Sequence, residues 1–210
     1  DFFKLPKGRG GALVPLGPGR ESASVGAAAG VTPISVTSEP TKVIAFAAIF
    51  ARERSNLVKA SLAVNSILGA EPDIISPEFP VVETAYYEKE MGHSLVKVYS
   101  SWPELISPES LVDIKLKAMT WENENAPGGR RIANIDPGYV FSGGLVLSTG
   151  KFRGHRLPLG RGIWGELTLN YHQGQFLSFP WTYLDYQRPE VQVWLMMMRQ
   201  NYMAALKNKR

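Results

Sequence analysis

A run of eight consecutive apolar residues, at positions 43–50, constrains the fold of this chain more than any other feature of its sequence. The run is too short to cross a lipid bilayer, which takes about 20 residues of helix. It also contains no polar position that would face solvent. A short apolar segment of this kind is typical of a strand that is buried in the core. We therefore expect residues 43–50 to form a buried strand.

Apolar residues recur at helical spacing in three further segments. The first covers residues 57–68 and is followed by Gly69, a residue type that commonly ends a helix. The second begins at Ser107, where a serine suited to the N-cap precedes a proline at the first helical position. The third covers about residues 189–206. These patterns predict three helices.

The rest of the folded region combines weaker signals. Asp136 followed by Pro137 again has the order of a helix start, which predicts a fourth helix over residues 139–148, although a Gly-Gly pair weakens this pattern. Strands are expected near residues 95–102, 131–135 and 155–179, and the proline-rich residues 72–82 suit a sheet edge or a loop. Together the elements predict an α+β fold, with a mainly antiparallel or mixed sheet and about four helices packed on it.

The first forty residues differ from the rest in composition. Residues 1–40 contain seven Gly, five Pro and five Ala, so few side chains remain that could build a core. This composition is typical of a flexible leader, and an ordered arm lying on the domain is the alternative. Residues 41–210 are expected to form one domain, long enough to bury a core without disulfides or metals. The chain opens with Asp rather than Met, as a processed chain or a fragment would.

Charge and composition exclude several classes of protein. Lys and Arg number 23 against 19 Asp and Glu, a net charge of +4 that permits an anionic ligand without requiring nucleic acid. The absence of Cys excludes a disulfide framework and a thiol nucleophile, and three scattered His do not suggest a zinc site. Neither a membrane span nor a signal peptide is recognisable. Because a chain without Cys fits a reducing compartment, we expect a cytoplasmic protein.

A glycine-rich motif, GRGIWG at residues 160–165, is the first candidate for ligand binding. A dinucleotide-binding fingerprint would have to open a helix, but a strand pattern follows here. The motif resembles the phosphate-covering loop of protein kinases, although the other kinase motifs are absent. Two interpretations stay open: a tight turn that needs positive φ, or a hairpin in which the backbone at Gly160 and Gly162 binds phosphate.

A basic segment surrounds this motif. No acidic residue lies between Asp136 and Glu166. Its cations could bind phosphate or carboxylate groups, with Arg able to bind in a bidentate manner, or they could form a solvated face. The candidate ligand-binding residues of this segment are Lys151, His155, Arg156 and Arg161.

Three carboxylates are candidates for catalysis. Glu90 lies in a probable loop of aromatic and acidic residues and could act as a general base or a metal ligand. Asp136, with its neighbour Asn134, lies at a predicted strand-to-helix junction, which is a common ligand position, although Asp136 could also be a simple helix cap. Glu166 closes the basic segment. One or two of these carboxylates, together with ligand phosphates, would suit Mg²⁺ if the fold brings them together.

Aromatic residues form the last group of candidates. Tyr86 and Tyr87 precede Glu90, and Trp181 and Tyr183 precede the last predicted helix, with Asp185 beside them. Such rings could stack on a base or a sugar. They could equally pack on the core and tie the loops to the sheet.

Six segments carry a resemblance to a known family: YYEKEMG at 86–92, DIK at 113–115, NIDPGY at 134–139, HR at 155–156, LGRGIW at 159–164 and PWTYLDY at 180–186. Together they resemble an uncharacterised bacterial family, domain of unknown function 4416, over about residues 43–206. This resemblance implies no established activity. Some relatives carry a GTP-binding label, but the chain lacks a Walker A loop, which excludes a P-loop GTPase.

These candidates combine into one hypothesis about function. We expect a polar cleft that binds a phosphorylated small molecule or a nucleotide, with or without turning it over. Two alternatives stay open. The protein could be a non-enzymatic subunit of a larger protein assembly, or an RNA-binding module, which the small net charge favours least.

Overall fold

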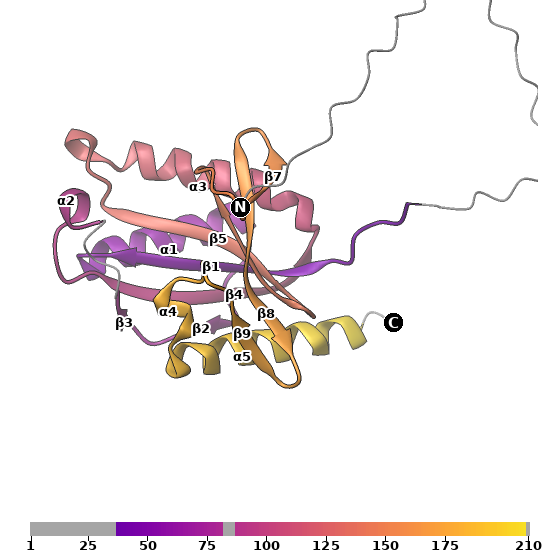
Figure 1. Cartoon of the computed structure of the whole chain (residues 1–210). Helices are drawn as coiled ribbons and strands as arrows, with labels where there is room; N and C mark the ends of the chain where they lie inside the picture. Colours follow the sequence, from indigo (N-terminus) through magenta and orange to yellow (C-terminus); the bar gives the residue numbers. More distant parts are fainter. Residues whose placement is uncertain (1–36, 82–86, 209–210) are drawn as a thin grey trace, which may run out of the picture. The chain divides into compact units, whose positions relative to one another are not determined.

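The structure, a computed structural model, describes residues 37–81 and 87–208. The leader expected at residues 1–40 therefore lies almost wholly outside the described residues. From Glu39 onward the chain forms one compact unit. Its described part contains one nine-stranded sheet, in which all paired strands are antiparallel, with helices on both faces (Figure 1). The predicted α+β fold is confirmed.

The strands follow the order β2-β4-β1-β5-β6-β8-β7, with β3 also paired to β4 and β9 also paired to β8. The strands are β1 Val43–Ala51, β2 Ile74–Ile75, β3 Phe79–Pro80, β4 Val96–Ile106, β5 Ala133–Phe141, β6 Gly144–Thr149, β7 Leu157–Gly160, β8 Ile163–His172 and β9 Gln175–Ser178. The helices are α1 Arg54–Leu68, α2 Glu88–Met91, α3 Leu111–Glu124, α4 Leu184–Gln187 and α5 Pro189–Lys207, with 3-10 turns at Pro108–Ser110 and Pro127–Gly129.

Strand β1 lies between β4 and β5, and it is buried along its whole length, as predicted. Alternate residues of a strand face opposite sides of a sheet. Ala47 and Ile49 pack against α1 and α3, whereas Phe46 and Ala48 pack on the other side, against α5. Figure 1 shows α1 and α3 on one side of the long strands and α4 and α5 on the other. The apolar run thus serves two cores, one on each face of the sheet.

The three helices predicted from apolar spacing are confirmed. Helix α1 ends at Gly69, whose φ of 69° is a left-handed conformation that glycine adopts without strain. The hydroxyl of Ser107 accepts a hydrogen bond from the N–H of Glu109, at the start of the 3-10 turn that leads into α3. Helix α5 covers the predicted residues 189–206. None of the described helices is long and apolar enough to cross a membrane.

The helix predicted over residues 139–148 is wrong. Asp136 and Pro137 lie inside β5, and the residues that follow form the β5–β6 hairpin. Tyr139 and Val140 favour a strand, and glycines in the turn disfavour a helix. The Asp-Pro pair therefore lies within a strand, where the proline has no N–H to donate to a neighbouring strand.

Strands β5 and β6 pair over only four residues of each strand. The ladder ends at the pair of Gly138 and Leu147. Beyond this pair, residues 133–137 of β5 lie beside β1 alone, and residues 148–149 of β6 lie beside β8 alone. Pro137 explains this ending because it has no N–H to donate to a neighbouring strand. Its carbonyl instead accepts a hydrogen bond from the hydroxyl of Ser148 at 2.7 Å. We call this divergence the fork, with residues 133–137 on its β5 side and residues 148–149 on its β6 side.

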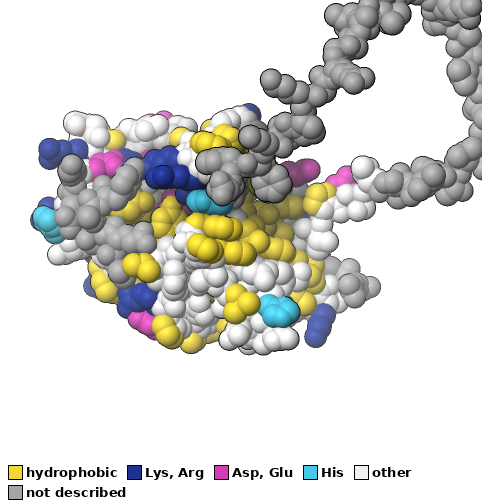
Figure 2. Space-filling view, in the orientation of Figure 1, with side chains coloured by type: hydrophobic (Ala, Val, Ile, Leu, Met, Phe, Trp, Pro, Cys, Tyr) yellow, Lys and Arg dark blue, Asp and Glu magenta, His cyan; other side chains and the backbone are white. Residues whose placement is uncertain are grey.

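Some apolar side chains remain at the surface of the β7–β8–β9 region. Leu157 of β7 is 72% exposed, and Leu159, Leu167 and Leu177 are exposed as well. Figure 2 shows a broad area of hydrophobic side chains near the middle of one face, bordered by a histidine and by Lys and Arg side chains.

Candidate functional site

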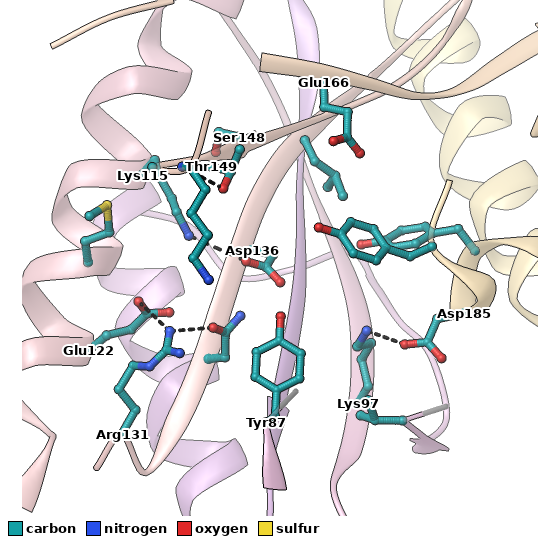
Figure 3. Close-up of a pocket in the computed structure, with 18 of the residues that line it drawn as sticks. Tyr87, Lys97, Lys115, Glu122, Arg131, Asp136, Ser148, Thr149, Glu166 and Asp185 are labelled. Carbon is teal, nitrogen blue, oxygen red and sulfur yellow. Dashed lines mark hydrogen bonds and ion pairs between the residues drawn. The ribbon is translucent and has the colours of Figure 1, made fainter. Parts of the chain in front are cut away.

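A cavity of about 310 Å³ opens at the fork. Helix α3 bounds it on one side and the segment around α4 bounds it on the other, with β5, β6 and β8 between them. Figure 3 shows charged side chains from these elements directed into a shared space. We call it the fork cavity. Its polar lining residues are Tyr87, Lys97, Lys115, Glu122, Arg131, Asn134, Asp136, Ser148, Thr149, Lys151, Arg156, Glu166, Tyr183, Asp185 and Tyr186.

Helix α3 completes the open edge of β5. At Ile135 this edge of β5 has no neighbouring strand, so the backbone bonds to side chains of α3 instead. Glu122 Oε1 accepts from the Ile135 N–H at 2.6 Å, and Lys115 Nζ donates to the Ile135 carbonyl at 2.8 Å. Lys115 also lies 3.5 Å from the carboxylate of Asp136. The two α3 residues are seven positions apart, which places them on one face of the helix, and both are buried. Pairing the buried backbone thus places a cation and an anion in the cavity wall.

Ion pairs continue along this wall from Glu122. Arg131 lies 3.5 Å from the Glu122 carboxylate and donates to both oxygens of Glu90, at 2.5 and 2.7 Å. It also donates to Oδ1 of Asn134 at 2.7 Å. Burial raises the pKa of the Glu122 carboxyl above its ordinary value, whereas the hydrogen bonds from Arg131 lower the pKa of Glu90. Of the two carboxyls, Glu122 is therefore the one that takes up a proton more readily.

A second buried ion pair lies on the opposite wall. Lys97 of β4 donates to the carboxylate of Asp185 in α4 at 2.5 Å, and both side chains are less than a tenth exposed. The Lys97 ammonium also lies 5.0 Å from the ring centre of Phe50 and 5.9 Å from that of Tyr186. The faces of these rings attract the cation. This wall therefore holds its ammonium group in place by both a carboxylate and two aromatic rings.

A third charged group lies where β8 faces the segment before β7. Oε2 of Glu166 accepts from Arg156 Nε at 2.7 Å and lies 2.8 Å from His155 Nε2. Arg156 also donates to the hydroxyl of Tyr183 at 3.2 Å, so it connects β8 to the segment before α4. The ring of His155 stacks on Trp181, with ring centres 4.9 Å apart. Burial raises the pKa of Tyr183, which keeps its hydroxyl neutral.

Two buried polar atoms of the lining have no hydrogen-bond partner among the described residues. They are Nδ2 of Asn134, a donor, and Oε1 of Glu166, an acceptor. Asn134 uses its Oδ1 for Arg131, and Glu166 uses its Oε2 for Arg156. Buried polar groups of folded proteins are almost always paired, with protein, water or a ligand. An occupant of the fork cavity, water or ligand, would pair both atoms by accepting from Asn134 and donating to Glu166.

A family model described as "Domain of unknown function (DUF4416)" matches residues 41–202. The chain belongs to the DUF4416 family. The resemblance predicted from six short segments is thus confirmed. No curated protein and no solved structure gives a significant match.

The fork cavity of this DUF4416 domain collects predicted residues from separate segments of the chain. Glu90 and His155 do not line it but bond to residues that do, Arg131 and Glu166. Trp181 stacks on His155. The predicted residues that line the cavity are Tyr87, Asn134, Asp136, Lys151, Arg156, Glu166, Tyr183 and Asp185. Tyr86 lies outside the described residues.

The glycine-rich segment lies elsewhere. Gly160, Arg161 and Gly162 have φ values of 108°, 50° and 78° and form the turn between β7 and β8, as the tight-turn interpretation predicts. None of the three lines the fork cavity. Arg161 pairs with Asp113 of α3 on the exposed surface. Phosphate binding by this loop stays a prediction without support from the cavity.

The carboxylates predicted as metal ligands each have a cationic partner. Glu90 pairs with Arg131, Asp136 pairs with Lys115, and Glu166 pairs with Arg156. Over residues 37–81 and 87–208, no group of three or more Asp, Glu and His is placed to hold a metal ion. The described site thus consists of ion pairs.

Several lining residues were missed by the sequence reasoning, yet some carried a signal. Lys115 and Glu122 lie four residues after Leu111 and Ala118, so both fall on the apolar stripe of α3. Lys97 likewise interrupts an apolar run in β4. A lone charge within an apolar pattern indicates a buried charge that needs partners. The missed residues are Lys97, Lys115, Glu122, Arg131, Ser148 and Thr149.

Proposed function

We propose that this DUF4416 domain binds a small phosphorylated molecule in the fork cavity. The observation that carries this proposal is the convergence of five cationic side chains on one cavity of about 310 Å³. They come from β4, α3, the segment before β5, and the loop between β6 and β7. The five are Lys97, Lys115, Arg131, Lys151 and Arg156.

The charge balance of the cavity favours an anion. Its five cations stand against four lining carboxylates, those of Glu122, Asp136, Glu166 and Asp185, and against Glu90, which bonds to Arg131 from just outside the lining, so the formal charges balance at 5 − 5 = 0. Protonation of Glu122, which burial favours, leaves one positive charge in excess. Lysine has three N–H donors, and Lys97 and Lys115 keep donor capacity beyond the bonds described above. A phosphate group would accept from several of these cations at once.

The size of the cavity favours a small ligand. Pockets that bind small molecules and cofactors have volumes of roughly 300–1,000 Å³, and the fork cavity lies at the lower end of that range. This volume suits a phosphorylated small molecule better than a nucleotide. The tyrosines of the lining, Tyr87 and Tyr183 among them, would contact the apolar parts of such a ligand.

The first test is calorimetric titration with inorganic phosphate and a panel of phosphate monoesters. A charge-assisted hydrogen bond contributes about 1.5–3 kcal/mol, so Lys151→Ala should weaken phosphate binding roughly tenfold or more. Arg161→Ala removes a cation of the β7–β8 turn, outside the cavity, and it should leave the affinity unchanged. Absence of binding by every phosphate compound, or equal losses in both variants, would refute the proposal.

The exposed apolar surface favours a second candidate function, that of a non-enzymatic subunit in a larger assembly. Leu157 and Phe152 are 72% and 67% exposed, and leucines of β8 and β9 are exposed as well. Large contiguous apolar patches on a surface often mark protein-binding sites. Light scattering of the full chain, freshly separated from a native extract, would show a particle well above 23.2 kDa if this function is the correct one.

A further inference from the structure

We infer that the ligand of the fork cavity carries a hydroxyl group that donates to Oε1 of Glu166, so that it is a phosphorylated polyol. This inference rests on the proposed function and names the class of molecule that the same cavity would take. It depends on which atoms of the lining lack partners and on the local charge around them.

Glu166 presents an acceptor that the protein itself does not use. Its side chain is only 2% exposed, and Oε2 is occupied by Arg156 and His155. Oε1 has no partner in the described part of the chain. Figure 3 shows this carboxylate extending from β8 at the rim of the same space that Asp136 and Lys97 face. A buried acceptor without a donor is unfavourable, and a donor on the ligand would remove that penalty.

Asn134 presents the complementary group on the other side of the fork. Its Oδ1 accepts from Arg131, which directs the amide so that Nδ2 is left as an unpaired buried donor. Asn134 belongs to β5, whereas Glu166 belongs to β8, the strand beside β6. A molecule that spans the fork must therefore offer an acceptor, such as a phosphate oxygen, to one side and a donor to the other.

Local charge decides what kind of donor fits. The negative charge of Glu166 is already balanced by Arg156 at 2.7 Å, and His155 lies 2.8 Å from the same oxygen. An ammonium group would add a further positive charge to this buried site, which is unfavourable at low dielectric. A hydroxyl donates the same hydrogen bond without adding charge. An alkyl group would leave Oε1 unpaired.

Three phosphate monoesters with the same three-carbon skeleton separate these cases. Glycerol 3-phosphate carries hydroxyls, propyl phosphate carries none, and 3-aminopropyl phosphate carries an ammonium group. Titrated against the full chain, glycerol 3-phosphate should bind roughly tenfold or more tightly than either of the others, as expected for one hydrogen bond to a charged acceptor. Inorganic phosphate serves as the reference for the shared anionic group.

A matched pair of variants assigns the preference to Glu166. Glu166→Gln replaces the charged acceptor by a neutral amide, so the advantage of glycerol 3-phosphate over propyl phosphate should fall several-fold. Glu78→Gln alters another Glu–Arg pair, bonded to Arg54 at 2.7 and 2.9 Å outside the cavity, and should leave that advantage unchanged. Since the Glu166 variant alters a buried pair, thermal unfolding checks that it is folded, and the ligand series on the unaltered chain stands by itself.

The outcomes separate the inference from the proposed function. If no phosphate compound binds, both fail. If phosphate compounds bind but propyl or 3-aminopropyl phosphate binds as tightly as glycerol 3-phosphate, the hydroxyl inference alone is overturned. A preference for glycerol 3-phosphate that Glu166→Gln reduces and Glu78→Gln does not would support both.

Discussion

Glu122 serves the fold and the candidate site at the same time. Its Oε1 completes the backbone pairing of Ile135, while its other oxygen lies 3.5 Å from Arg131 at the cavity wall. The first contact requires only an acceptor, but burial makes the ionised carboxylate costly and raises its pKa. Glu122 therefore stabilises the edge of β5, but its ionised carboxylate is unfavourable at this buried position.

Replacing this carboxyl by an amide should change how stability depends on pH. Because the pKa of Glu122 is raised in the folded chain, the folded state binds a proton more readily than the unfolded state, and stability is lost as pH rises from about 4.5 through the raised value. Glu122→Gln keeps an acceptor for Ile135 but cannot ionise. Its melting temperature relative to the unaltered chain should therefore increase between pH 4.5 and neutrality.

Glu124→Gln, at an exposed position of the same helix, is the control and should show no such trend. The measurement is thermal unfolding by circular dichroism at several pH values. A constant difference between Glu122→Gln and the unaltered chain across this range would contradict the role given to burial.

At the scale of elements, the β5–β6 hairpin makes the fork possible, and its two strands approach each other closely at Gly138. A Cβ added to Gly138 would lie 2.2 Å from the backbone oxygen of Val146 and 3.0 Å from a methyl of Leu147. With a Cβ at residue 138, β5 and β6 could not stay paired at their present separation. Glycine here allows the close approach of two backbones at the last pair before the strands diverge.

Gly138→Ala should therefore destabilise the domain by about 1–3 kcal/mol, the usual range for overpacking. Gly154→Ala is a matched control, because an added Cβ there would meet nothing within 4 Å. Urea unfolding of both variants measures the difference. Equal stabilities would show that the hairpin can move apart at Gly138 without cost.

The elements also show what could be predicted from the sequence. Residues 43–50 form an unbroken apolar run and the three long helices carry apolar residues at helical spacing, so these elements were predicted correctly. The hairpin was missed because Asp136 and Pro137 have the local order of a helix start, and only the neighbouring β1 shows that they belong to a strand. Lys97 and Lys115 were not recognised as site residues because convergence at the fork depends on the pairing of distant strands.

At the scale of the whole molecule, residues 1–40 hold few side chains suited to a core, and the two described cores contain residues from Ile44 onward. Both faces of β1 are covered by helices from this region, and the family match begins at residue 41. Removal of residues 1–38 should therefore leave the melting temperature within about 2 °C, since 1 kcal/mol corresponds to about 2–4 °C in a domain of this size. Differential scanning calorimetry of the full and shortened chains makes the comparison. A drop of many degrees would show that the first residues contribute to the core.

The short ladder between β5 and β6 gives the sheet a seam. On one side lie β2, β4, β1 and β5, and on the other lie β6, β8 and β7, with four residue pairs joining the two parts directly. The fork cavity spans this seam, with Asn134 on one side and Glu166 on the other. A molecule bonded to both Asn134 and Glu166 would link the two parts of the sheet. Its binding would therefore restrict the motion of one part relative to the other and make the sheet stiffer.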